Sequence, residues 1–210
     1  MSNGFLDIAT TPSVLAAQVA NGSAGLYDKV VPKRPSNHFG ETEAEFIAAR
    51  DSFYMASVSE SGWPYVQHRG GPPGFLKVID ETTLAFPDFR GNRQYISLGN
   101  VVADNRVAMI LMDYPRRRRL KLYGRIGARD LVAEPNLMAR LALPDYRGVV
   151  ERAFVLDLEA FDWNCPQHIT PRFTESEIAA ASAPLIARVA DLEAENAALR
   201  TALSGKEPSA

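Results

Sequence analysis

The hydrophobic pattern changes twice along the chain, and the middle region has the pattern of β-strands. From Ser52 onward, short apolar or alternating runs are separated by turn residues, as in "FYMASVSESGWPYVQH", "GFLKVIDETTLAF", "RVAMILMDY" and "RAFVLDLEAFDW". The pairs Ser61-Gly62 and Asp80-Glu81 stand where hairpin turns are expected. The pattern predicts five to seven mostly antiparallel strands in a compact β-barrel, with small helices around 91–100 and 135–142.

Helical signals precede the strands. A short helix is predicted over 11–20, followed by a Gly, Pro and Ser-rich passage. In "ETEAEFIAARD", Thr42 is followed three residues later by Glu45, which matches a capping box and predicts a helix over about 43–50. We therefore divide the chain into an N-terminal arm (1–40), a β-barrel domain (41–172) and a C-terminal helix with its tail (173–210).

The tail carries a seven-residue repeat. Ile178, Leu185, Leu192 and Leu199 form one series, and a second series four positions on contains Val189, Asn196 and Leu203. This is an a/d seam with asparagine at one a position, which favours a parallel, two-stranded coiled coil. The alternative is an amphipathic helix, over about 175–203, that packs on its own barrel.

Composition and charge exclude several classes of protein. The 210 residues carry a net charge of −2, which argues against a general nucleic-acid or membrane-surface binder. The single cysteine, Cys165, excludes an intramolecular disulfide and indicates a reducing, cytoplasmic setting. No apolar run approaches the length of a membrane span, so we expect neither export nor membrane insertion.

Several catalytic motifs are missing from the sequence. It contains no Walker phosphate loop, no GxGxxG, no HExxH and no GxSxG. The three histidines, His38, His68 and His168, lie far apart in sequence, so no metal site is expected. No residue stands out as a general base, and the catalytic residues are not predicted.

The stretch "FPDFRGNRQ" (86–94) is the strongest candidate site. An apolar strand runs through a small basic loop, with Arg90 and Arg93, into a short helix that contains Tyr95 and Ile96. The free amide groups and the dipole at a helix N-terminus favour an anion there. A solvated surface turn is the alternative interpretation.

A second basic stretch, "PRRRRLKLYGRIG", alternates. Leu120, Leu122 and Ile126 would face one side of a strand, and the cationic face would hold Arg119, Lys121, Tyr123 and Arg125. Two interpretations remain open. The charges protect an edge strand from aggregation, or Arg119 joins Arg90 or Arg93 in holding a phosphate.

Taken in order, these motifs resemble the pyridoxamine 5′-phosphate oxidase-like, FMN-binding split β-barrel family. The resemblance runs from about Thr42 to Gly124: helix, hairpin "MASVSESGWPYVQ", strands "FLKVID" and "LAFPD", the basic loop and helix, then "RRLKLYG". The segment "WNCPQHITPR" (163–172) is similar to a C-terminal signature of a flavin-nucleotide-binding branch of that family. The resemblance implies a mainly β fold, a split β-barrel with helical additions and a C-terminal helix.

The resemblance also implies a cofactor and the residues around it. The cofactor is FMN, with Lys77 near the flavin and the basic loop around the ribityl phosphate. The implied cofactor-binding residues are Gln67, His68, Arg69, Lys77, Val78, Pro87, Asp88, Arg90, Asn92, Arg93, Gln94, Arg119, Trp163, Asn164 and Gln167. The glycine-rich "GGPPGF" that follows Arg69 leaves open which of Gln67, His68 and Arg69 meets the flavin.

The function that follows is an FMN-dependent oxidoreductase, acting on a small-molecule substrate or electron donor as a homodimer with flavin sites at the subunit interface. The arginine and histidine pattern with which vitamin-converting oxidases hold their phosphorylated substrate is missing, so pyridoxamine phosphate is not the expected substrate. A non-catalytic flavin-binding or sensing module, or a dimeric adaptor, is the alternative.

Overall fold

The computed structural model describes residues 4–26, 36–164 and 166–204. Parts of the predicted N-terminal arm and of the predicted tail lie outside the described residues, and so does Cys165. The chain divides into two units, Met1–Ile169 and Thr170–Ala210.

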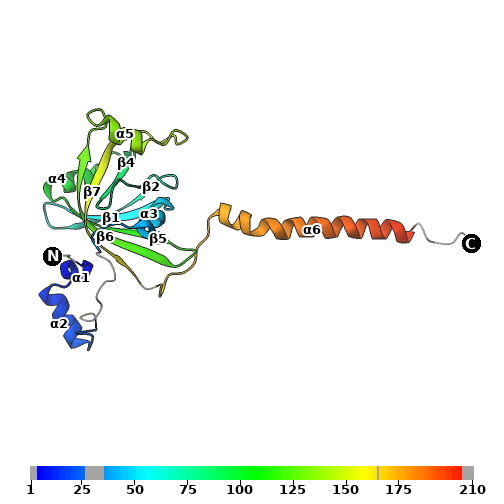
Figure 1. The fold of residues 1–210 in the computed structure, drawn as a ribbon, viewed down its shortest axis with the longest axis horizontal. Coiled ribbons are helices and arrows are strands. Elements are labelled where there is room, and N and C mark those ends of the chain that lie inside the picture. Colours follow the sequence, from blue (N-terminus) through cyan, green and yellow to red (C-terminus); the bar gives the residue numbers. More distant parts are fainter. Residues whose placement is uncertain (1–3, 27–35, 165, 205–210) are drawn as a thin grey trace, which may run out of the picture. The chain divides into compact units, whose positions relative to one another are not determined.

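Within these ranges the first unit is built on one antiparallel sheet, with the strand order β2-β1-β5-β6-β7-β4-β3 (Figure 1). The strands are β1 (Ser52–Val58), β2 (Pro64–Gly70), β3 (Lys77–Val78), β4 (Thr83–Phe89), β5 (Arg106–Asp113), β6 (Arg118–Arg129) and β7 (Val150–Trp163). The sheet curls on itself. The evidence is an ion pair between Arg69 on β2 and Asp88 on β4, two strands that lie far apart in the strand order. The prediction of a mainly β, antiparallel barrel is confirmed.

Alternate residues of each strand enclose the core, as the period-two pattern requires. On β6, Leu120, Leu122 and Ile126 are buried, as predicted. The largest buried side chains are aromatic, and Phe86 lies between Phe53 and Phe154, with ring centroids 5.0 and 5.4 Å away. Burial of these rings provides much of the hydrophobic free energy that closes the barrel.

Five helices accompany the strands in the described part of this unit: α1 (Phe5–Ala9), α2 (Pro12–Ala20), α3 (Glu41–Ala48), α4 (Ile96–Ala103) and α5 (Pro135–Leu141). The predicted helices near 11–20 and 135–142 are confirmed, and Thr11 caps α2 through its side chain. The helix predicted around 91–100 begins only at Ile96. Helix α1 was not predicted, and its Phe5 stacks on Tyr123 of β6 with centroids 4.5 Å apart.

The predicted capping box of α3 is wrong by two residues. The helix begins at Glu41 after the N-cap Gly40, so Thr42 lies inside it. Glu43 accepts a hydrogen bond from the Gly40 amide at 3.0 Å and another from the Trp163 indole at 2.8 Å. Because the second bond comes from the end of β7, a distant contact favours this helix start over the one predicted locally.

The cationic face of β6 does not belong to an edge strand, since β6 lies between β5 and β7. The edge-strand interpretation is therefore wrong. Lys121 forms an ion pair with Asp162 on β7 at 3.3 Å, and Arg125 pairs with Glu159 at 2.8 Å. Acidic residues on the neighbouring strand thus balance part of this face.

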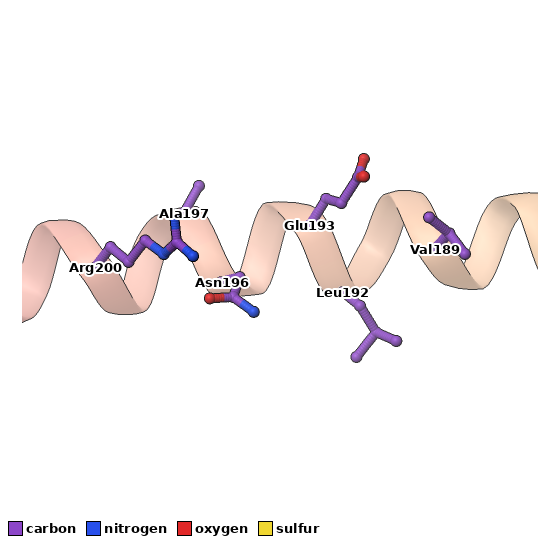
Figure 2. Close-up of a pocket in the computed structure, with 6 residues that line it drawn as sticks. All are labelled: Val189, Leu192, Glu193, Asn196, Ala197 and Arg200. Carbon is purple, nitrogen blue, oxygen red and sulfur yellow. The ribbon is translucent and has the colours of Figure 1, made fainter.

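The second unit contains helix α6 (Glu175–Ser204), which confirms the predicted C-terminal helix. Thr174 and Glu177 form a capping box: the Thr174 amide donates to the Glu177 carboxylate at 2.8 Å, and the Glu177 amide donates to Thr174 Oγ1 at 3.2 Å. None of its described residues is buried. A hollow of about 420 Å³ lies along α6, lined by this one helix, so it is an open side of the helix rather than an enclosed cavity (Figure 2).

None of the described helices combines the length and the hydrophobicity that a membrane span requires.

Replacing Gly124 with alanine should destabilise the barrel by about 1–3 kcal/mol. Gly124 lies at a register shift between β6 and β7, and an added Cβ would come within 2.7 Å of the Asp157 carbonyl oxygen and of Leu156 Cδ2. Urea unfolding measures the effect. Gly99→Ala is the matched control, because a Cβ at Gly99 meets nothing within 4 Å and alanine favours a helix. Equal stability of the two variants would contradict the prediction.

Candidate functional site

A hollow of about 190 Å³ lies where the basic loop meets the curled sheet. Its walls come from β2, the end of β4, the loop after β4, the first turn of α4 and the start of β7. The lining residues are Tyr65, Gln67, Arg69, Asp88, Phe89, Gly91, Asn92, Arg93, Gln94, Tyr95, Ile96, Ser97, Leu98 and Glu151. The predicted candidate loop therefore forms one wall of a polar hollow.

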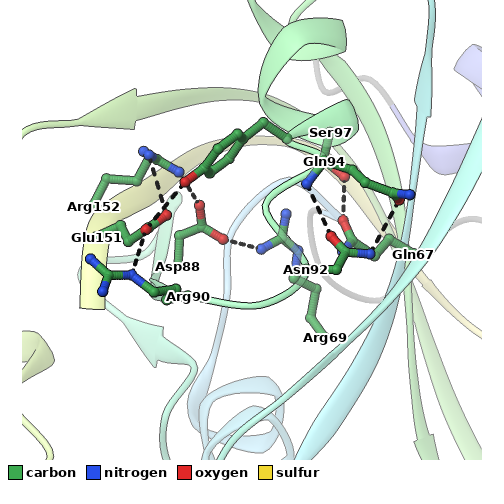
Figure 3. Close-up of polar contacts among 10 residues, drawn as sticks. Gln67, Arg69, Asp88, Arg90, Asn92, Gln94, Ser97, Glu151 and Arg152 are labelled. Atoms are coloured by element: carbon green, nitrogen blue, oxygen red, sulfur yellow. Dashed lines mark hydrogen bonds and ion pairs between the residues drawn. The ribbon is translucent and has the colours of Figure 1, made fainter. Parts of the chain in front are cut away.

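Asp88 joins two arginines beside the hollow (Figure 3). Its carboxylate accepts hydrogen bonds from Arg69 on β2 and from Arg152 on β7, the latter at 2.6 Å. The exposed fraction of the side chain is 11% for Asp88, 12% for Arg69 and 21% for Arg152. Arg69 also lies over the Phe154 ring, 5.1 Å from its centroid. The carboxylate thus positions two cations that would otherwise repel each other.

Glu151 holds a second set of contacts at the rim. It accepts hydrogen bonds from Arg90 Nε at 2.9 Å and from the Tyr95 hydroxyl at 3.2 Å, and it lies 3.5 Å from Arg152 Nη2. The hydrogen bond from Arg90 lowers the pKa of Glu151 below its ordinary value, and Tyr95 and Arg152 act in the same direction. Glu151 is therefore ionised at neutral pH, and these contacts weaken only when the pH falls through the lowered pKa.

The loop backbone is held in an uncommon conformation. Arg93 and Tyr95 have positive φ angles of 61° and 53°, which non-glycine residues seldom adopt. The Asn92 side chain accepts from the Gln94 amide and donates to Gln94 Oε1, both at 3.1 Å. Such backbone strain is typical of ligand-binding loops.

Helix α4 begins in the hollow without a side-chain cap. Tyr95 is its N-cap residue and makes no capping hydrogen bond through its side chain. Ser97, in the first turn, instead donates to Gln67 Oε1 on β2 at 2.6 Å. The first amide groups of the helix are therefore available to a ligand at the positive end of its dipole.

Positive charge exceeds negative charge around the hollow. The excess is two positive charges, because four arginines and two carboxylates line or border the hollow: Arg69, Arg90, Arg93, Arg152, Asp88 and Glu151. Within the described residues, Arg93 forms no hydrogen bond or ion pair, and the buried Arg69 Nε has no hydrogen-bond partner. An anion with several acceptor oxygens would satisfy these donors.

The structure brings together part of the predicted set. Gln67, Arg69, Asp88, Asn92, Arg93 and Gln94 line the hollow, and Arg90 lies next to it through Glu151. His68 is exposed on the opposite face of β2, where its ring is 5.4 Å from that of Tyr54. Of the three residues around which the resemblance left a choice, Gln67 and Arg69 therefore face the hollow.

The residues predicted on β3 and at Pro87 do not line the hollow. Lys77 pairs with Ala85, whose side chain packs in a small cluster with Leu141, and Val78 packs against the main core. Pro87 is buried and shares a strand face with Ala85. Their predicted contacts with the cofactor remain predictions.

Arg119 and Asn164 form a separate pair in the single chain. The Asn164 amide donates to the Arg119 carbonyl at 3.2 Å, and both Arg119 Nε and Asn164 Oδ1 are buried and have no hydrogen-bond partner in the described part of the chain. Neither residue lines the hollow that contains Arg93. One chain therefore does not place Arg119 in that hollow, where we expected it to join Arg90 or Arg93.

The other two C-terminal candidates also lie outside the hollow. Trp163 packs edge-on against Phe46 at 4.7 Å and donates to Glu43, so its contacts here are structural. Gln167 is exposed.

Sequence reasoning missed Glu151 and Arg152 on β7, and Tyr65, Tyr95 and Ser97 as lining residues. The Glu-Arg pair at the start of β7 was visible as a polar break before an apolar strand. These two residues reach the hollow because the register between β4 and β7 places Arg152 opposite Asp88. That register is a long-range property that local patterns do not reveal.

The fold and the hollow define a small, mainly antiparallel split-barrel protein with an arginine-rich hollow at a strand-to-helix loop. The family model described as Pyridoxamine 5'-phosphate oxidase matches residues 39–149, just over half of the 210 residues. The chain belongs to this family.

Other comparisons add little to this assignment. No curated protein matches the chain significantly. A proposed pyridoxamine 5′-phosphate oxidase from Lactobacillus delbrueckii has a TM-score of 0.46 at 18% identity, covering 60% of this chain and 94% of the other. HupZ from Group A Streptococcus has a TM-score of 0.45 at 12% identity, covering 64% of this chain and 99% of the other. An FMN-binding protein from Syntrophomonas wolfei has a TM-score of 0.41 at 14% identity, covering 58% of this chain and 87% of the other. These similarities are weak, so the assignment rests on the matched segment.

Replacing Asp88 with asparagine should destabilise the protein by about 3 kcal/mol, because it leaves two partly buried guanidinium groups without their shared carboxylate. Chemical denaturation at neutral pH measures the change. The matched control is Asp162→Asn, which removes a carboxylate that is 40% exposed and pairs with Lys121; it should cost less than about 1 kcal/mol. A loss at Asp88 no larger than that of the control would show that the Asp88 contacts do not stabilise the barrel.

Proposed function

We propose that this protein is an FMN-binding flavoprotein, with the hollow described above as the site of the cofactor's phosphate. The observation that carries the proposal is the arginine-rich loop at the start of α4, in a chain of the pyridoxamine 5′-phosphate oxidase family. Family membership supports a flavin, and the absence of a dinucleotide fingerprint from the sequence favours the mononucleotide.

The charges around the hollow fit a phosphate monoester. Such a group carries about two negative charges near neutral pH, which matches the excess of two positive charges from the surrounding arginines. Arg93 is free to form a charge-assisted pair with it, and the amides of the first turn of α4 can donate as well. Asp88 and Glu151 would hold Arg69, Arg90 and Arg152 in position before the ligand arrives.

The size of the hollow supports a site that extends beyond one chain. About 190 Å³ is less than the roughly 300–1,000 Å³ of ordinary small-molecule sites, and it suits the phosphate end of FMN better than the whole molecule. Arg119 and Asn164 offer a donor and an acceptor that have no hydrogen-bond partner among the described residues. A homodimer in which the two sets of residues meet would complete the site, and we propose that arrangement.

The proposed activity is that of an oxidoreductase. FMN, when bound, supplies the redox chemistry, while the protein orients the cofactor and surrounds it with charge. The chain's own contribution is the arginine set, the amides of α4 and the polar side chains of Gln67, Asn92 and Gln94. We propose a small-molecule substrate or electron donor, with turnover in the cytoplasm.

The purified protein should take up FMN at micromolar concentration and become yellow, with weaker binding of riboflavin, which lacks the phosphate. Absorbance spectra and mass spectrometry of the released cofactor check this. A colourless protein that does not bind added FMN would overturn the proposal. Loss of the yellow colour on addition of a nicotinamide donor would support the enzyme, whereas a yellow protein inert to such donors would support the flavin-binding module.

Replacing Arg93 with alanine should weaken FMN binding by about 1.5–3 kcal/mol, because it removes a charge-assisted contact with the phosphate. Riboflavin binding should hardly change. Isothermal titration with both ligands gives the comparison, and Arg129→Ala, which removes an exposed arginine on β6, is the control. Equal losses for the two ligands would place Arg93 away from the phosphate.

A further inference from the structure

Helix α6 is the one described helix or strand of the second unit, so no other element of that unit packs against it. It contains 30 residues, and none of its described residues is buried. Its larger apolar side chains are widely exposed, from 44% at Leu192 to 71% at Leu185. A helix in water is held mainly by packing of its apolar face, so this helix needs a partner surface.

The apolar side chains lie at the positions of a coiled-coil seam. With Val189, Asn196 and Leu203 at a, the d positions are occupied by Ile178, Leu185, Leu192 and Leu199. The a position at 182 is serine, so the continuous seam runs from Leu185 to Leu203. Pro184, inside the helix, falls at c, on the side away from the seam.

The charged residues beside the seam complement a second copy of the same helix. Positions g are Arg188 and Glu195, and the e positions five residues further on are Glu193 and Arg200. In a parallel, in-register pair, each g residue faces the following e residue of the other chain. Arg188 would therefore face Glu193 of the partner subunit, and Glu195 would face Arg200 of the partner subunit, on both sides of the pair.

We propose that α6 binds α6 of a second copy of this chain as a parallel, in-register, two-stranded coiled coil. Figure 2 shows the segment that carries the proposal, with Leu192 and Asn196 of the seam beside Glu193 and Arg200 of the flanking e positions. This interface does not depend on the flavin, since all its residues lie in the second unit of the chain.

The asparagine selects the parallel orientation. In parallel register, Asn196 meets Asn196 of the partner subunit, and the two amides can hydrogen-bond inside the seam. An antiparallel pair aligned over the longer span from Ile178 to Leu203 would place Asn196 opposite Leu185, which leaves a buried amide unsatisfied. It would also keep only the contact between Arg188 and Glu195.

The two orientations respond differently to charge reversal. Glu195→Arg alone places arginine opposite Arg200 in the parallel pair and opposite Arg188 in the antiparallel one, so both weaken. Adding Arg200→Glu restores the parallel contact but not the antiparallel one. Asp191→Arg is the matched control, since position 191 is a c position outside the seam.

Cysteine cross-linking of the full chain measures whether two α6 helices pair in the parallel orientation. In the Cys165→Ser background, Val189→Cys places one thiol at an a position, where a parallel pair brings the two Cα atoms within disulfide reach. We expect a disulfide-linked dimer under mild oxidation. Glu195→Arg should reduce its yield at limiting protein concentration by about tenfold, while Glu195→Arg with Arg200→Glu, and Asp191→Arg alone, should preserve it.

Three outcomes would overturn the proposal: no cross-linked dimer, a dimer yield insensitive to Glu195→Arg, or no restoration by Arg200→Glu. Preferred cross-linking of Val189→Cys chains to Leu192→Cys chains would show an antiparallel pair and would also overturn it. FMN titration of the same variants separates this test from the proposed function: a chain that binds FMN without cross-linking refutes the coiled coil alone, and a cross-linked chain that does not bind FMN refutes the proposed function alone.

Discussion

The arrangement of the hollow depends on one buried carboxylate. Asp88 lies near the end of β4 and binds Arg69 from β2 and Arg152 from β7. β2 is an edge strand of the sheet, whereas β4 and β7 lie toward its other end, so these ion pairs link parts of the sheet that the backbone hydrogen bonds do not connect directly. The same carboxylate orients two of the four arginines around the hollow. The curl of the sheet and the electrostatics of the candidate site therefore share one constraint.

Local sequence patterns were enough to predict much of the fold. The alternation on β6 predicted that Leu120, Leu122 and Ile126 face the core, and turn residues marked the hairpins. The helical repeat predicted α6 almost to the residue. These features depend on neighbours within a few positions along the chain, where hydrophobic period and turn chemistry are decisive.

The remaining features depend on contacts between distant segments. Glu43 caps α3 while it binds Trp163, 120 positions further on, and no local motif contains that partner. In the candidate site, the loop 90–94 was found because its arginines precede a helix. Arg152 and Glu151 were not found, because their place follows from the register of β7 against β4. Arg119 was expected near that loop, but the single chain keeps it apart.

The separate helical unit has a further consequence for how two barrels would meet. A parallel pair of helices starts from the same end in both chains, so the two barrels attached there through residues 170–174 would share a small volume. Each barrel would then experience the other at an effective concentration on the order of millimolar. A contact between barrels too weak to form in dilute solution would be populated under those conditions, and a ligand site built from both barrels could assemble without a large interface of its own.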